Sequence, residues 1–179
     1  FRSLFMDRIY DSSRRHFNLF FDNAWNSLVE MDSYGHDVEA GWLLCEAARV
    51  LEDRQLMDRA NRLALDVTDA CLVEGLSDKG YMMYEKKGGR TTGHASWWGQ
   101  IETMIACVNA WQISGNDVYL QSADTVWTFV KDCMIDREYG EWYSDCFDGE
   151  PKKDTPKVSM WRCPYHTVRL GVEIHNRLK

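Results

Sequence analysis

Hydrophobic side chains along this chain follow two alternating helical patterns. Residues 36–51 and 97–113 are apolar on nearly every face, and Glu102 is the only charged side chain of the second segment. Residues 55–73 and 117–134 each carry one apolar stripe between polar positions. A helix that is apolar all round is buried on every side, whereas a striped helix covers a core from outside. The pattern therefore predicts an all-α fold in which inner helices alternate with outer ones.

A third inner helix is expected over residues 164–178. Pro164 suits its first position, because a proline there lacks only an N–H that the helix would not use. The run Phe17–Phe21 is expected to form a short strand or a loop. The run Pro151–Asp154 is expected to be a solvated loop.

The helices repeat with a period of about 63 residues. Three short motifs share one register, 63 and 67 positions apart, namely His36-x-x-Glu39, Gly99-x-x-Glu102 and His166-x-x-Arg169. Repeated helical hairpins of this kind build an α/α toroid. Its inner helices all run the same way, so their first turns meet at one mouth. We therefore expect His36, the Trp97–Trp98 pair and His166 to surround a common cavity.

The number of helices is too small for a closed ring. Only about five are visible, whereas six hairpins need about twelve helices, or roughly 350–400 residues at this repeat length. Residues 1–179 are therefore expected to form the C-terminal part of a single toroidal domain. The inner faces of half a ring lack partners, so we expect this chain to self-associate or to bind a missing N-terminal half.

Composition narrows the range of partners. The net charge of −7 and a pI near 5.2 argue against nucleic acid. No apolar run reaches the roughly 18 residues that a membrane span requires. The six cysteines form no Cys-x-x-Cys pair, and four of them fall inside helical patterns as small buried hydrophobes. This usage favours a reducing compartment, and we expect a cytoplasmic protein.

His36 and His166 are the strongest candidates for chemistry. Each falls in the first turn of an inner helix, and tryptophans lie nearby in the sequence. Histidine is the side chain best suited to moving protons near neutral pH. Two histidines at equivalent places in a repeating fold suggest that a proton is removed from one side of a substrate and returned from the other.

Four linked motifs resemble the N-acylglucosamine 2-epimerase superfamily, and most of all its cellobiose 2-epimerase branch. The resemblance covers essentially the whole chain. The motifs are Ser33-Tyr34-Gly35-His36-Asp37-Val38-Glu39-Ala40, Trp97-Trp98-x-Gln100-x-Glu102, Gly140-Glu141-Trp142 and Trp161-x-Cys163-Pro164-Tyr165-His166.

The resemblance implies an (α/α)6 barrel that epimerises C2 of a reducing-end sugar, glucose to mannose. It makes His36 and His166 the general acid/base pair. Glu39 and Glu102 become supporting carboxylates, and Trp98 and Trp161 become the aromatic residues that contact the sugar. A further histidine and a sugar-binding arginine are expected in the missing half.

The implied chemistry suits these residue types. A C2 proton beside an open-chain aldehyde is acidic enough for a neutral imidazole, and the enediolate can rotate about C2–C3 before it is protonated again. This route needs no metal or nucleotide cofactor. Gly99, Thr167–Val168 and the stretch 92–96 depart from the family pattern, which puts the choice of sugar in doubt more than the reaction.

Several alternatives stay open. Within the superfamily these are an N-acylglucosamine 2-epimerase and a mannose isomerase. A glycoside hydrolase on the same toroid would use Glu39 and Glu102 as its acid/base pair. An inactive sugar-binding fragment is a further alternative. Glu102 also has a structural reading, because a buried charge needs a partner such as Arg169.

The remaining histidines and tryptophans have structural interpretations. His16 and His175 are expected at the surface or in packing, and the role of His94 is left open. One member of the Trp97–Trp98 pair is expected to face the cavity. Four tryptophans are expected in the core, namely Trp25, Trp42, Trp111 and Trp127.

Overall fold

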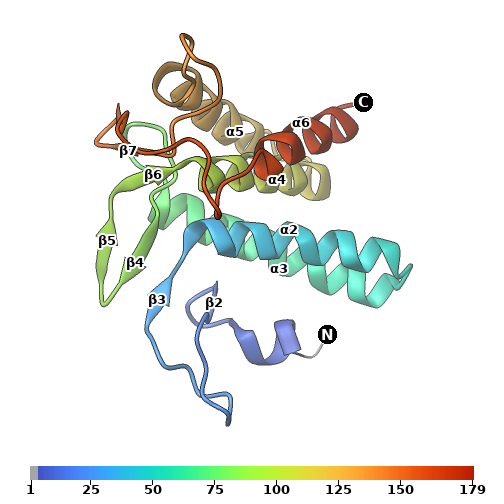
Figure 1. Cartoon of the computed structure of the whole chain (residues 1–179). Helices are drawn as coiled ribbons and strands as arrows, with labels where there is room; N and C mark the ends of the chain where they lie inside the picture. The colour runs from blue at the N-terminus through green and yellow to red at the C-terminus, as the bar shows by residue number, and fades with distance from the viewer. Residues whose placement is uncertain (1–3) are drawn as a thin grey trace.

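The predicted alternation of inner and outer helices is present in the computed structural model, which describes residues 4–179 (Figure 1). The inner helices are α2 (Tyr34–Val50), α4 (Trp97–Ser114) and α6 (Tyr165–Arg177). The outer helices are α3 (Arg54–Gly75) and α5 (Val118–Phe129), and the π-helix η2 (Val130–Met134) prolongs α5. The inner helices run in one direction and the outer helices return in the other (Figure 1). The last inner helix begins one residue later than expected, because Pro164 is its N-cap.

Helix α4 is the centre of the fold. It packs against all four of the other α-helices, α2, α3, α5 and α6. Its residues from Gly99 to Ala110 are all buried, as the apolar pattern predicts. The same expectation is wrong for much of α2, where Leu43 and Val50 are 39% and 79% exposed. The free face of α2 has no neighbouring inner helix among the described residues, so its apolar side chains stay in contact with solvent.

Short antiparallel strands gather near the ends where α2 and α4 begin (Figure 1). The first pair is β1 (Tyr10–Asp11) and β2 (His16–Phe17), which follow the π-helix η1 (Phe5–Ile9). The second sheet is β3 (Met31–Asp32), β4 (Glu85–Lys87) and β5 (Arg90–Thr92). The third is β6 (His94–Ser96), β7 (Asp145–Phe147) and β8 (Glu150–Pro151). Of residues 17–21, expected as a short strand or a loop, only Phe17 lies in a strand, β2. The expected loop at 151–154 begins one residue later, because Pro151 ends strand β8.

The predicted tryptophan core is right for two residues and wrong for two. Trp42 is buried and Trp111 is half-buried against a small cluster around α4 and α5. Trp25 is 45% exposed, because it lies in a loop where its ring contacts Phe21. Trp127 is 37% exposed, because it lines an open groove between α5 and α6.

All six cysteines are free thiols, and Cys45, Cys71, Cys107 and Cys146 are buried. This agrees with their interpretation as small hydrophobes. Among residues 4–179, none of the helices combines the length and the apolar character that a membrane crossing would need.

Candidate functional site

His36 lies in the first turn of α2, with its ring exposed to the open inner face of the molecule. Ser33 is the N-cap of this helix, and its hydroxyl lies 2.8 Å from Nδ1 of His36. The ring of His36 packs on the indole of Trp98, with 4.7 Å between the ring centroids. Because Nδ1 is engaged by Ser33, the nitrogen left for a substrate is Nε2.

Gly35 makes the contact between His36 and Trp98 possible. A Cβ atom at position 35 would lie 2.6 Å from two carbons of the Trp98 ring. No side-chain carbon fits at that distance, so only glycine allows the indole to lie against the start of α2. This explains physically why glycine precedes the histidine.

His166 occupies the matching position in the first turn of α6 and is paired with Glu102 of α4. The distance from Nδ1 to Oε1 is 2.6 Å. A carboxylate can only accept hydrogen bonds, so Nδ1 is the donor and Nε2 is the ring nitrogen left to face a substrate. The Trp98 indole lies 6.0 Å from the His166 ring. The structure thus brings His36 and His166 beside the same indole.

Glu102 is fully buried and accepts three hydrogen bonds. Besides His166, its donors are the indole nitrogen of Trp42 at 2.9 Å and Nη1 of Arg169 at 3.0 Å. Burial of a charge is costly unless it is paired and hydrogen-bonded, and here both conditions are met. The expected pairing with Arg169 is therefore present, and it coexists with the contact to His166.

Arg169 joins the two carboxylates that the sequence singled out. Its Nη1 lies 2.6 Å from Oε1 of Glu39 and 3.0 Å from Oε1 of Glu102. Its guanidinium also lies over the rings of Tyr165 and Trp42, at 4.2 and 5.3 Å. Glu39, Glu102 and His166 place one ligand atom each within 4.8 Å of the others, an arrangement that could also hold a cation. Arg169 already supplies the positive charge between them.

The two adjacent tryptophans have different surroundings. Trp98 contacts both histidines and meets the ring of Tyr84 edge-on at 6.3 Å. Trp97 packs under the guanidinium of Arg162 at 4.8 Å, although its ring also lies 6.4 Å from His166. Trp98 is therefore the better candidate for the indole that faces the cavity.

Trp98 contacts an aromatic stack through the ring of Tyr84. His94 lies between the rings of Tyr84 and Phe147, with centroid distances of 4.5 and 5.1 Å. Burial lowers the pKa of His94, although Asp145 at 3.7 Å acts in the opposite sense. Among the aromatic contacts of the described residues, His94 is linked to the site indirectly, because it packs on Tyr84 and Tyr84 packs on Trp98.

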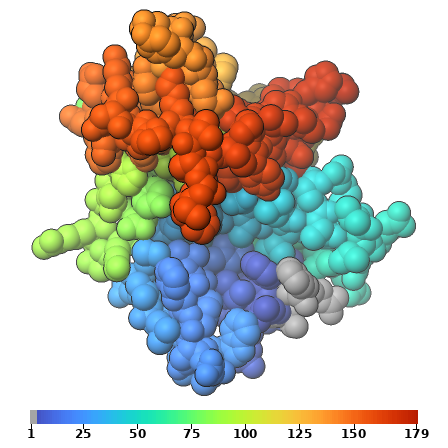
Figure 2. All heavy atoms as spheres, in the orientation of Figure 1, coloured from blue at the N-terminus to red at the C-terminus, as the bar shows by residue number. Residues whose placement is uncertain are grey.

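Trp161 is not brought to the two histidines. It is 85% exposed, and its ring makes no aromatic contact within the described part of the chain. The neighbouring Arg162 is buried and donates to the hydroxyl of Ser144 and the carbonyl of Trp142, which anchors this segment. Figure 2 shows the segment before α6, in orange-red, as a raised part of the surface next to the green and blue segments.

Sequence reasoning missed two contributions to the site. Trp42 was expected in the core for packing alone, yet its indole nitrogen hydrogen-bonds Glu102. The expectation that His16 lies at the surface or in packing is right only for packing, because its side chain is 1% exposed and is paired with Asp37. The sequence offered one signal for this pair, namely Asp37 directly after His36. A carboxylate buried at the start of a helix needs a partner, so a pairing side chain could have been expected. His175 is exposed on α6, as expected.

Comparison with known proteins shows which family this sequence matches. Residues 1–169 match the family model of N-acylglucosamine 2-epimerase. A cellobiose 2-epimerase of Bacteroides fragilis is 40% identical over 176 residues, which are 96% of this chain and 44% of that protein. The chain therefore spans less than half the length of this relative.

Two solved structures superpose closely. A sugar epimerase from a ruminal bacterium has a TM-score of 0.94 at 34% identity, covering 98% of this chain and 46% of that one. A cellobiose 2-epimerase from Bacillus thermoamylovorans has a TM-score of 0.91 at 33% identity, covering 98% and 45%. These neighbours are (α/α)6 barrels, so the predicted fold class is confirmed and the described helices form part of such a barrel.

Proposed function

The chain belongs to the N-acylglucosamine 2-epimerase family, and on that premise we propose that it is part of an isomerase, a carbohydrate 2-epimerase acting on the reducing-end glucose of a disaccharide such as cellobiose. The observation that carries the proposal is the pair His36 and His166, set beside one indole at equivalent helix starts. Because the chain spans less than half the length of its relatives, the proposal includes a cavity completed by residues outside this chain.

His166 and Glu102 are suited to act as a base. The carboxylate holds Nδ1–H at 2.6 Å and favours the imidazolium that forms when Nε2 takes a proton. In the proposed reaction one imidazole removes the C2 proton of the open-chain aldehyde, and the electron pair moves onto the C1 oxygen as an enediolate. After rotation about C2–C3, an imidazolium returns a proton to C2 from the opposite side. No electron is gained or lost, and glucose becomes mannose.

His36 is suited to the second proton transfer. Its Nδ1 is engaged by Ser33 at 2.8 Å, so Nε2 remains available at the open inner face. Trp98 lies next to both imidazoles and has the flat apolar surface that a sugar ring can cover. Trp161 is proposed as a second contact for the sugar, at the exposed rim of the site.

Glu39 and Glu102 fit supporting roles better than those of a glycosidase pair. Glycoside hydrolysis needs two carboxyl groups that reach the scissile bond, one of them as the acid. Glu102 is fully buried, and its oxygens are occupied by Trp42, His166 and Arg169. It therefore acts through His166. This geometry favours the epimerase over a hydrolase.

The test uses the protein extended to the length of its relatives. We expect His36→Asn and His166→Asn each to lower epimerisation of cellobiose at least about 1,000-fold, because each removes a proton-transfer group and disturbs its partner. Deuterium from heavy water should appear at C2 of the product. His175→Asn, on the exposed face of α6, is the matched control and should keep full activity.

Full activity in either of the first two variants would overturn the assignment of the histidines. A free monosaccharide as product would instead indicate a hydrolase, and a ketose would indicate an isomerase of the mannose type. Faster conversion of N-acetylglucosamine than of cellobiose would move the proposal to the sister activity. Sugar binding without turnover would identify a sugar-binding protein.

A further inference from the structure

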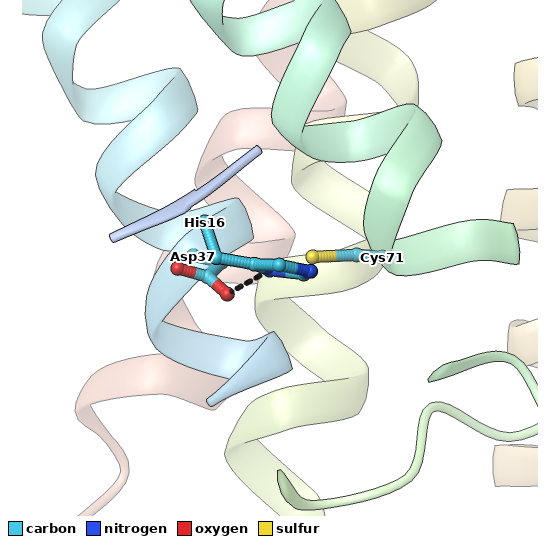
Figure 3. A group of neighbouring side chains, drawn as sticks. All are labelled: His16, Asp37 and Cys71. Atoms are coloured by element: carbon cyan, nitrogen blue, oxygen red, sulfur yellow. Dashed lines mark hydrogen bonds and ion pairs between the residues drawn. The ribbon is translucent and has the colours of Figure 1, made fainter. Parts of the chain in front are cut away.

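A buried cluster of charged groups lies under the first turn of α2, next to the candidate site. The side chains of His16 on β2 and Asp37 on α2 are 1% and 0% exposed. Nδ1 of His16 lies 2.7 Å from Oδ2 of Asp37, and the backbone N–H of Phe17 donates to Oδ1 at 2.8 Å. Figure 3 shows the His16 ring between Asp37 and Cys71, with its far edge directed toward the sulfur. Asp37 directly follows His36.

The charges around His16 balance when its ring is protonated and Asp37 is ionised, a state in which the attraction between the two offsets the burial that on its own raises the pKa of Asp37. Three carboxylates face this region, from Asp32, Asp37 and Glu74. Arg14 pairs with Asp32 at 2.6 Å, and Lys86 pairs with Glu74 at 2.7 Å. Asp37 has only His16 as a cationic partner among the described residues, and burying an uncompensated carboxylate is costly.

Three further observations support a charged imidazole. Burial alone lowers the pKa of His16, but the hydrogen bond and charge of Asp37, helped by Asp32 and Glu74, outweigh it and raise the pKa above its usual value. Nε2 is buried, has no hydrogen-bond partner within residues 4–179, and lies 3.6 Å from Oε1 of Glu74. A proton there faces a negative charge, whereas a lone pair would face it unfavourably.

We propose that His16 is a positioning residue, which as an imidazolium clamps Asp37 and so holds the first turn of α2 where His36 lies against Trp98. His36 and Asp37 are successive residues of one helical turn, so a tilt that releases Asp37 also moves His36. The backbone at Gly35 is packed directly against Trp98, because the indole occupies the space that a side chain at position 35 would fill. A shift of this turn therefore changes its contact with Trp98. The effect on catalysis rests on the proposed function, but the geometric clamp does not.

A metal ion is the competing occupant of this cluster. His16, Asp37 and Cys71 place ligand atoms within 4.8 Å of one another, as do His16, Asp32 and Glu74. A metal would need a neutral imidazole and a thiolate. Burial raises the pKa of Cys71 well above its usual value, and its thiol donates to the carbonyl of Tyr34 at 3.8 Å. These facts favour the imidazolium.

The first experiment uses the chain itself with 15N-labelled histidine. At pH 7 we expect both ring nitrogens of His16 to carry protons, and we expect a nuclear Overhauser contact between the rings of His36 and Trp98. His16→Gln should abolish that contact while far-UV circular dichroism stays unchanged. His175→Gln is the matched control and should preserve it. A neutral His16 at pH 7, or a contact that survives His16→Gln, would overturn the proposal.

If His16→Gln does not fold, alkaline titration of the unmodified chain replaces it. Deprotonation of the His16 ring should then coincide with loss of the His36–Trp98 contact, and a contact that persists after deprotonation contradicts the clamp. The groups facing His16 are known, so their titration can be followed alongside it: Asp32, Asp37, Cys71 and Glu74. Zinc added alone at micromolar concentration should leave the His16 resonances in place. Binding that is lost in Cys71→Ser would establish a metal site instead.

The second experiment separates positioning from mere stability in the protein extended to family length. We expect His16→Gln to lower kcat by on the order of 10- to 100-fold with KM changed less than about twofold, because a displaced base impairs reaction more than binding. The alkaline limit of kcat should follow the titration of His16. If His36→Asn leaves activity intact while the ring contact still depends on His16, the proposed function fails and the clamp stands.

Discussion

Glu102 is the residue on which the contacts of the candidate site converge. It is fully buried and accepts hydrogen bonds from Trp42 on α2 and from His166 and Arg169 on α6. A neutral amide in its place would have to turn an N–H toward one of these donors. The loss of one partner from a buried charged pair costs about 3–5 kcal/mol.

We therefore expect Glu102→Gln to lower the unfolding free energy of the chain by about 3–5 kcal/mol, measured by urea denaturation. Glu150→Gln, an exposed change on β8, should stay within about 0.5 kcal/mol of the unmodified chain. Equal stability of the two variants would show that the buried network contributes little to the fold.

His94 gives the chain a defined sensitivity to acid. Burial between Tyr84 and Phe147 lowers its pKa, so the folded state binds a proton more weakly than the unfolded state does. Its contribution to stability is therefore complete above the unfolded pKa of about 6.5 and is lost as the pH falls through the lower folded pKa. Each unit between the two values corresponds to at most about 1.4 kcal/mol.

The check compares the chain with His94→Phe, which keeps a flat ring in the stack. Urea midpoints between pH 8 and pH 5 should fall more steeply for the unmodified chain than for the variant. Asp145 lies 3.7 Å from His94 and titrates in both proteins, so the difference between the two curves reports the histidine together with its effect on Asp145. Parallel curves would mean that His94 titrates normally.

At this scale the sequence predicted which side chains lie together better than it predicted the partners of each one. His36, His166, Glu39 and Glu102 could be found because they recur in one register of the repeat. The partners of His16 could not, because β2 and α2 meet only through the tertiary fold. Trp127 was misjudged because its helical stripe looks the same whether or not a neighbour covers it.

At the scale of elements, the start of α2 depends on a single glycine. The Trp98 ring lies where a Cβ at position 35 would be, at 2.6 Å. Gly35→Ala should therefore destabilise the chain by about 1–3 kcal/mol through overpacking and should change its near-UV circular dichroism, because the indole must shift.

Gly171 in α6 provides the matched control for this substitution. Nothing lies within 4 Å of a Cβ atom there. Gly171→Ala should stabilise the chain by about 0.5–1 kcal/mol, because alanine has less conformational freedom than glycine in the unfolded state and so loses less when the helix forms. Urea denaturation of both variants should show an unfolding free energy that falls for Gly35→Ala and rises for Gly171→Ala. A neutral Gly35→Ala would show that Trp98 has room to move.

The helices were predictable from the sequence, whereas the small sheets were not. Periodicity over twelve to twenty residues separates an inner helix from an outer one, and the boundaries of α2 to α6 fall within a few residues of expectation. The strands are two or three residues long, too short for alternation to show. Their pairing joins segments far apart in the chain, such as His94 with Phe147.

At the scale of the whole molecule, the chain leaves apolar surface open in two grooves. A groove of about 620 Å³ between α5 and α6 is lined by Leu120, Trp127 and Leu170, among others. A second groove, of about 600 Å³, runs along α2 and includes His36 and Glu39. Helix α6 has no buried residue among those described. Exposed apolar patches larger than a few hundred Å² usually mark an interface.

We therefore expect the isolated chain to self-associate, or to bind the remaining part of a family-length protein, and to lack epimerase activity alone. Val168 and Val172 are successive turns of α6 and are 60% and 50% exposed. Replacing both with lysine should shift sedimentation toward the monomer, because desolvating a charge in an apolar contact is costly. Far-UV circular dichroism should not change, since neither side chain is buried.

Val73→Lys is the control for this experiment. Val73 is 83% exposed on the outer helix α3, so its replacement adds one lysine charge, half of that in the double variant, without touching α6. It should leave the sedimentation pattern of the unmodified chain intact. A stable monomer before any substitution would contradict the argument from apolar surface, because α2 and α6 would then tolerate water along their whole inner faces. An isolated chain that epimerises cellobiose would go further, since the cavity would then be complete without residues beyond those of this chain.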